Sequence, residues 1–353
     1  MTAVLHLFDS QTPPPALDIL ERLRRSRPND RTACVGSAAG RVDLPAADYA
    51  LRRPGPWTVM AGAGVRELIT PNGISVVHCW SAGLAPLATL LGPGVCVSLF
   101  RPPGARDLTA CREAVRAGAV VVASSDAGRR RLVSDGLPVE AIEIVAPAVE
   151  PGPADASLRR EARSHWDWAD TDRVVVTRAE SDADDSAYWT AWAAGILHQM
   201  GEPVRLLVMG SPTARRRAEE LSRRNGLSRL VHLVERSDRD LAWAAADVAV
   251  AYDTDGFGLT GAAAAVGAGV AVVAADAGEL RDTFVDERNA LLVKPKTPRL
   301  LARALWRLFE DPPLRIRLAH NALKEPAGGH NGASMEGRMK ALYARIRPPS
   351  PRG

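Results

Sequence analysis

The chain has 353 residues, which is enough for about two domains of ordinary size. Its composition, 46% hydrophobic and 24% charged, is that of a globular protein and excludes a wholly disordered or fibrous chain. The formal net charge is +4, without a concentrated basic stripe or a known binding motif, so nucleic acid is not an expected partner.

The spacing of the cysteines and the length of the apolar runs indicate the cellular compartment in which the protein is expected. No CxxC spacing occurs among the four cysteines, so neither a disulfide framework nor a zinc site is expected. Met1 to Phe8 has the pattern of a strand rather than of a secretion signal. The run Gly261 to Ala275 is too short and too weakly apolar to cross a bilayer. We therefore expect a cytoplasmic protein without resident cofactor or metal.

Short β-branched runs alternate with amphipathic segments in the first 150 residues. The segment Ala16 to Arg25, for example, places its leucines on one helical face. Near-continuous apolar strands separated by helices imply a parallel sheet covered on both faces, as in doubly wound α/β domains. The strands are predicted at Val4–Phe8, Thr32–Val35, Ser75–Cys79, Val95–Phe100, Ala119–Ala123 and Ile142–Ala146.

The same pattern restarts after a Pro- and Gly-rich stretch, Pro147 to Pro153, which reads as a linker. Here strands are predicted at Arg173–Thr177, Arg205–Met209, Leu230–Val234, Val248–Tyr252, Val270–Ala274 and Ala290–Val293, and helices at Ser186–Gln199, Pro212–Asn225, Asp238–Ala246 and Pro298–Glu310. The pattern indicates an N-terminal domain at 1–150, a C-terminal domain at 151–335, and a helix and tail at 336–353. Packing of that helix back on the first domain is left open.

Two doubly wound domains are expected to face a central cleft at the carboxyl ends of their strands, where ligands of such folds bind. The polar run after Val248 to Tyr252 ends at Asp255, and Gly256-Phe257-Gly258 then leads into a helix beginning near Thr260. A Gly-rich turn at a helix N-terminus suits an anion such as a diphosphate. Taken alone, the turn is better explained by backbone shape, for which Gly256 and Gly258 are needed.

A longer stretch resembles the donor-binding half of retaining glycosyltransferases with the GT-B fold, of the glycosyltransferase family 4 (group 1) type. The pattern of that family is E-G-F-G-L-P-x-x-E-A-M-A-x-G-x-P-V-V-A, followed by a D-x-G-G turn and an N-G-x-L-V segment. The matching residues, in order and at family spacing, are Asp255-Gly256-Phe257-Gly258-Leu259, Gly267, Val272-Val273-Ala274, Asp276, Gly278 and Asn289 to Val293. The resemblance extends more loosely over most of the chain.

The resemblance implies a hexosyltransferase that uses a nucleotide-diphosphate sugar, with a carbohydrate, lipid or small molecule as acceptor. Asp255 would hold donor-sugar hydroxyls, and Arg178 would neutralise the leaving diphosphate. The segment Gly256, Phe257, Gly258, Leu259 and Thr260 would cradle that diphosphate, and Leu233 and Val234 would border the nucleotide base. On the acceptor side the candidates are Ser10 and His78.

Three family positions carry other residues: Ala263 stands where a glutamate usually grips the ribose, Ala183 near the usual lysine, and Phe100 where a histidine is usual. These departures leave a second interpretation open, a catalytically degenerate GT-B protein that acts as a binding or scaffolding module. A nucleotide-sugar epimerase of similar architecture is a third.

Several further residues have an ordinary structural alternative. His78, on an apolar strand, is more often a core histidine than a base. Trp189 and Trp192 lie three apart on a predicted helix, where we expect them in the core rather than stacked on a sugar. The acidic run around Asp184 lacks a histidine neighbour and is expected to be solvated rather than metal-binding. Contact of the basic terminal helix with a membrane surface stays an alternative.

Overall fold

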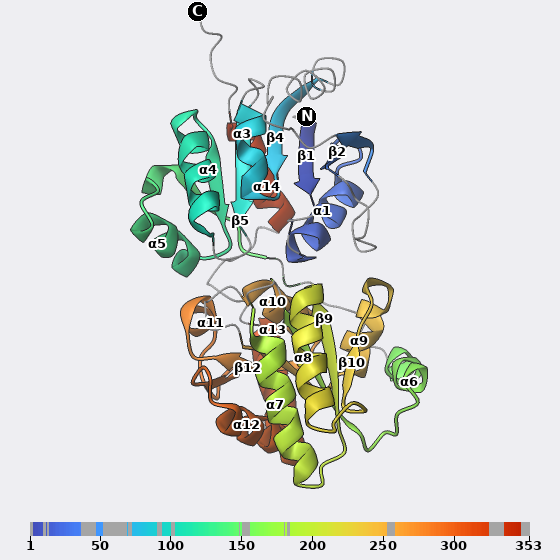
Figure 1. The fold of residues 1–353 in the computed structure, drawn as a ribbon. Coiled ribbons are helices and arrows are strands. Elements are labelled where there is room, and N and C mark those ends of the chain that lie inside the picture. The colour runs from blue at the N-terminus through green and yellow to red at the C-terminus, as the bar shows by residue number, and fades with distance from the viewer. Residues whose placement is uncertain are drawn as a thin grey trace, which may run out of the picture. The chain divides into compact units, whose positions relative to one another are not determined.

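The computed structural model describes residues 3–9, 12, 14–36, 47–51, 69, 73–89, 94–99, 103–147, 149, 156–179, 181, 184–252, 258–324 and 335–346. The chain divides into two compact units, Met1–Ala146 with Gly332–Gly353, and Pro147–Asn331. The described strands of each unit form one parallel sheet with helices on it (Figure 1). The predicted α/β fold class, GT-B with two Rossmann-like domains, is confirmed.

The first unit holds a seven-stranded parallel sheet of order β3-β2-β1-β4-β5-β6-β7 among its described residues. Its apolar strands form a buried core with α3, α4 and α5, whose bounds are given below. The strands are β1 (Ala3–Asp9), β2 (Arg31–Val35), β3 (Tyr49–Leu51), β4 (Ile74–Cys79), β5 (Gly94–Leu99), β6 (Val120–Ala123) and β7 (Ile142–Ile144). The helices are α1 (Pro14–Ser26), α3 (Ala85–Thr89), α4 (Ala105–Arg116), α5 (Asp126–Ser134) and α14 (Met335–Arg345), with 3₁₀ turns at Ala82–Leu84 and Val139–Ala141.

The second unit holds a six-stranded parallel sheet of order β10-β9-β8-β11-β12-β13 in its described part. Its strands are β8 (Arg173–Ala179), β9 (Val204–Gly210), β10 (Val231–Leu233), β11 (Val248–Ala251), β12 (Ala271–Ala275) and β13 (Leu291–Val293). Its helices are α6 (Ala156–His165), α7 (Ser186–Gln199), α8 (Pro212–Arg224), α9 (Arg239–Ala245), α10 (Leu259–Gly267), α11 (Gly278–Thr283), α12 (Pro298–Glu310) and α13 (Pro312–Lys324), with a 3₁₀ turn at Arg236–Asp238.

Hydrogen bonds to Asp247, at the amino ends of the central strands β8 and β11, connect α6 to the second sheet. The Asp247 carboxylate accepts hydrogen bonds from the Arg163 guanidinium at 2.9 Å and from the backbone N–H of Val174 at 2.7 Å. Arg159 bonds the same carboxylate at 2.5 Å. Because Arg163 is 3% exposed, its charge depends on this partner.

One expectation about the core is wrong. Trp192 was placed in the core with Trp189, but it is 44% exposed, and Trp189 is half-buried. The reason is that α7 is apolar on every side, so periodicity alone does not say which stripe faces outward. Among the described residues, no helix is long and apolar enough to cross a membrane.

Candidate functional site

The winding direction of the second sheet reverses between β8 and β11. From β8 the chain adds β9 and β10 on one side, and it then returns to place β11, β12 and β13 on the other. Loops leaving the carboxyl ends diverge at such a point, and ligands of doubly wound sheets bind there. Arg178, the last residue but one of β8, and Ala251, the last residue of β11, therefore mark the candidate site.

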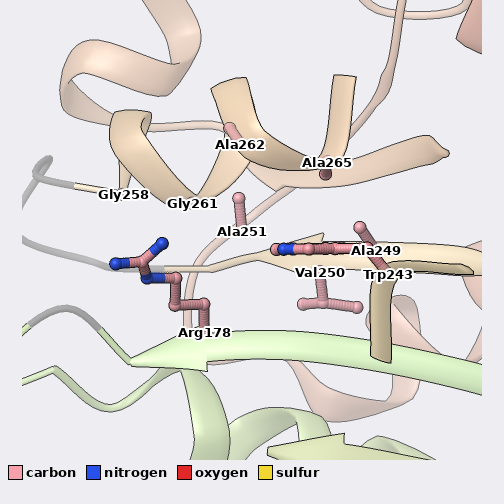
Figure 2. Close-up of a pocket in the computed structure, with 9 residues that line it drawn as sticks. All are labelled: Arg178, Trp243, Ala249, Val250, Ala251, Gly258, Gly261, Ala262 and Ala265. Atoms are coloured by element: carbon pink, nitrogen blue, oxygen red, sulfur yellow. The ribbon is translucent and has the colours of Figure 1, made fainter. Parts of the chain in front are cut away.

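Arg178 is the charged side chain at this point, and the strand pairing fixes its position. Thr177 pairs with Val250 of β11, and its hydroxyl donates to the Val250 carbonyl at 3.1 Å. On the other side Arg178 pairs with Met209 of β9. The Arg178 side chain is 8% exposed and extends toward Gly258 and Gly261, where α10 begins (Figure 2).

A pocket lies between α10 and the strands β8 and β11 (Figure 2). Its cavity volume is about 10 Å³, room for about one water molecule, whereas ligand pockets usually exceed about 300 Å³. Arg178 is the polar end of this pocket, and small residues form most of its wall. The lining residues are Arg178, Trp243, Ala249, Val250, Ala251, Gly258, Gly261, Ala262 and Ala265. The described part of the pocket therefore has room for a water-sized group and not for a nucleotide.

The start of α10 and Arg178 have electrostatic effects of the same sign. Gly258 is the N-cap of α10, and since it has no side chain it supplies no acceptor of its own to the first turn. The N-terminal end of a helix carries a partial positive charge, and a guanidinium presents a planar pair of donors. Both effects favour an anion with several oxygens, such as a phosphate.

A glycine at the end of β9 holds the end of β8 in place. The backbone N–H of Ser211 donates to the Ala179 carbonyl at 2.9 Å. Gly210 has φ +95°, and a Cβ at this position would lie 1.9 Å from the Ala179 oxygen. Only glycine therefore allows β9 to approach the residue that follows Arg178 so closely.

The remaining predicted donor-site residues fall into two groups. Asp255, Gly256, Phe257 and, on the acceptor side, Ser10 lie outside the described residues. Leu259 is buried and Thr260 is half-buried in the first turn of α10, but neither lines the pocket.

Leu233 and Val234 lie at the carboxyl end of the edge strand β10, which β9 separates from β8. Val234 is 3% exposed and belongs to the core, and Leu233 packs against that core. The structure therefore does not bring these two residues into the pocket with Arg178. Pattern reasoning missed Gly261 and Trp243, which do line it. The position of Gly261 in the first helical turn was the available signal for the former.

One of the three departures, Ala263, has a definite structural setting, since Ala183 and Phe100 lie outside the described residues. Ala263, at the position of the family's ribose-gripping glutamate, is 3% exposed and contributes no polar group. Two carboxylates of the acidic run turn toward α7: Asp184 accepts from the Ser186 N–H and Asp185 from the Trp189 indole N–H, each at 2.7 Å. These carboxylates therefore stabilise the start of a helix rather than standing free in solvent.

His78, the acceptor-side candidate of β4, lies in a polar network inside the first unit. Its Nδ1 is 2.6 Å from the Tyr343 hydroxyl of α14, and its Nε2 is 2.7 Å from the Ser98 hydroxyl of β5. The ring stacks on Trp80, with centroids 4.0 Å apart. Both ring nitrogens are thus occupied, as the core-histidine alternative requires.

A second histidine, His6 of β1, extends this network. The Trp80 indole donates to its Nδ1 at 3.2 Å, and its Nε2 is 3.3 Å from Asp30. Burial lowers the pKa of His6, although Asp30 opposes this effect. Burial lowers the pKa of His78 well below its ordinary value, and protonation of His6 would lower it further. Both rings are therefore neutral at pH 7.

A family match covers the sheet that holds Arg178. Residues 173–311 match the family model described as Glycosyl transferases group 1. The group 1 match begins at the first residue of β8 and ends just after α12, so it includes Arg178 and the whole of α10. No curated protein sequence matches the chain.

Several solved structures share the fold over nearly the whole chain. The HepE protein of Anabaena, solved with UDP-glucose, is 18% identical with a TM-score of 0.74, covering 92% of this chain and 94% of its own. Sucrose-phosphate synthase of Thermosynechococcus elongatus is 17% identical with a TM-score of 0.68, covering 98% and 99%. A glycosyltransferase of Rickettsia africae is 12% identical with a TM-score of 0.67, covering 98% of each chain.

Proposed function

We propose that the chain is a glycosyltransferase that moves a sugar from a nucleotide-diphosphate sugar to a carbohydrate, lipid or small-molecule acceptor, with retention of configuration. The observation that carries this proposal is the position of Arg178, whose guanidinium points to the start of α10 at the switch point of the second sheet. The group 1 match over the same residues supports it, as do the neighbours of similar fold.

The proposed chemistry is electrostatic. When the glycosidic bond to the diphosphate breaks, negative charge develops on the phosphate oxygens of the leaving group. Arg178 would stabilise this negative charge by donating two parallel N–H hydrogen bonds to the phosphate oxygens. The positive end of the α10 dipole would stabilise the same charge. Preorganised donors of this kind stabilise a transition state without reorganising during the reaction. Asp255 stays the predicted partner of the sugar hydroxyls.

A second candidate function has one specific observation in its favour. The buried Ala263 replaces the glutamate that the resemblance places on the ribose, so one contact with the nucleotide is lost. A protein of this kind would bind a nucleotide sugar without transferring it. An enzyme should release nucleoside diphosphate from the sugar nucleotide and should lose this activity in Asp255→Asn. A binding module should release none.

The binding step has its own test. We expect UDP, ADP or GDP to raise the melting temperature of the chain. At a hundred times the Kd the gain is about 2.7 kcal/mol, or roughly 5–10 °C for a unit of this size. Arg178→Ala should abolish the shift. Arg173→Ala, at the opposite end of the same strand, should lower the melting temperature measured without nucleotide. It should keep the increase in melting temperature that the nucleotide causes. A chain whose melting temperature responds to none of these nucleotides contradicts the proposal.

A further inference from the structure

The segment from Lys294 to Lys324, which contains α12 and α13, carries the positive charge excess of the chain. It holds eight Lys and Arg residues against two Asp and Glu residues, a formal charge of +6. The whole chain carries +4, so the remaining residues together are net negative. The expectation of no concentrated basic stripe therefore fails in this segment. A local excess of this kind attracts anionic partners.

One face of α12, which packs beside α7 and α13 (Figure 1), presents part of this charge to solvent. The exposed residues of the helix recur at three- and four-residue spacing, so they share about a third of its circumference. Two of them are large and apolar: Leu300 is 46% exposed and Trp306 is 42% exposed. The outward face therefore combines arginine with tryptophan and leucine. Its residues are Arg299, Leu300, Arg303, Trp306, Arg307 and Glu310.

The start of this face is positive without a compensating acid. The exposed side chains of Lys294, Lys296, Arg299 and Arg303 form no ion pair with another described residue. The first turn of α12 contains no acidic residue. Because the start of a helix has a partial positive charge of its own, basic side chains there reduce the stability of the helix. An anionic partner that covers this region would relieve that repulsion.

The turn that carries the two lysines is fixed to the sheet. The hydroxyl of the buried Tyr252, just after β11, donates to the Lys294 carbonyl at 2.5 Å. The same hydroxyl accepts the backbone N–H of Thr297 at 3.1 Å. The turn follows β13, so it lies at the same edge of the parallel sheet as Arg178. A partner bound to this turn therefore lies at the edge that holds the candidate site.

We infer that α12 and the turn before it bind the surface of an anionic lipid bilayer. Each Lys or Arg near such a surface adds to the attraction by the lipid headgroups. Exposed Trp and Leu side chains on an arginine-rich helix enter the boundary between headgroups and acyl chains. An anionic polymer such as polyphosphate offers Leu300 and Trp306 no such apolar layer. A second copy of the chain would present the same positive charge and be repelled. Binding to the bilayer does not depend on the proposed transfer reaction.

The test is cosedimentation of the full chain with vesicles of equal parts phosphatidylglycerol and phosphatidylcholine. Binding is expected at low salt and should be largely lost in about 1 M NaCl, where the Debye length is about 3 Å. Removing two charges in the double variant Arg299→Gln, Arg303→Gln should weaken binding about 30-fold. Trp306→Ala should weaken it about fivefold or more, because an exposed apolar side chain no longer enters the bilayer.

The matched control removes two exposed charges from the terminal helix α14, in the double variant Lys340→Gln, Arg345→Gln. It should bind vesicles as the parent chain does. Since Arg299 and Arg303 are exposed, their substitution should leave the melting temperature nearly unchanged, which shows that the fold is intact.

Three outcomes overturn the inference. The first is a chain that does not sediment with the anionic vesicles at low salt, or that sediments equally well with phosphatidylcholine alone. The second is binding that the α12 double variant keeps, or that the α14 double variant loses to the same extent. The third is vesicle binding that Trp306→Ala leaves unchanged and that inorganic polyphosphate abolishes, which would make the face a site for an anionic polymer.

Discussion

The buried histidines of the first unit predict that this unit loses stability in mild acid. His6 and His78 are both fully buried, and burial keeps the pKa of each below the ordinary value of 6.5. In the unfolded chain both regain that value. Below pH 6.5 the unfolded state therefore binds more protons than the folded state. The stability is complete above pH 6.5 and falls as the pH drops from there toward the folded pKa values.

The size of the effect follows from the number of protons. Each histidine that titrates only on unfolding changes the free energy of unfolding by about 1.4 kcal/mol per pH unit. His78 gives this full slope well below pH 6.5, because its folded pKa lies far below that value, and His6 adds to the slope only above its own folded pKa. Asp30 acts in a lower range: burial alone would raise its pKa, but hydrogen bonds from His6 and Arg27 bring it below 3.8. Between pH 7 and 5 the two imidazoles therefore dominate in this cluster.

The assay compares the slopes of stability against pH for the parent chain and His78→Gln. The variant loses the bonds to Tyr343 and Ser98 and should be less stable at pH 7.5. Its loss between pH 6 and 5 should nevertheless be smaller by about 1.4 kcal/mol, because one titrating group is gone. Calorimetry resolves the transition of each unit. His320→Gln, at an exposed site on α13, should change neither quantity. Equal slopes for the parent chain and His78→Gln would refute the reasoning.

Two further predictions concern residues that hold the second sheet together. Gly210→Ala should destabilise this unit by about 3 kcal/mol or more, since strain at φ +95° adds to a clash with the Ala179 carbonyl. Gly201→Ala, at φ +89° but in open space, should cost only about 1 kcal/mol in the same urea titration. Asp247→Ala should cost about 3–5 kcal/mol because it leaves the buried Arg163 charge without its carboxylate. A loss under 1 kcal/mol in thermal unfolding would contradict this.

The fold could be predicted because its signals are local. The bounds expected for α7 and α12 are those observed, since Asp185 and Pro298 mark starts and Asp311 with Pro312 marks an end. The strand Tyr49–Leu51 was missed. It has three residues, its side chains are not buried, and only pairing with β2 makes it a strand. The local sequence does not show that this segment pairs with β2.

The site could be predicted only in part, for a geometric reason. Arg178 was found through the family resemblance, and its place near the end of a predicted strand tells which edge of the sheet it reaches. It does not tell how far along that edge the residue lies. Leu233 and Val234 reach the same edge but stand two strands from β8. Trp243 lines the pocket through tertiary packing of α9, and its own neighbours in sequence give no sign of this.

In the proposed function, the residues that match the family and those that differ from it would act on different parts of a nucleotide. Arg178 and the start of α10 would bind the diphosphate, and their position follows from the strand order of the sheet. Ala263 lies further along α10 on a buried side, where a longer polar side chain would reach the ribose in the family that the chain resembles. Losing that contact lowers affinity without moving the guanidinium. The anion site can therefore persist whether or not transfer does, which is why binding and turnover require separate variants.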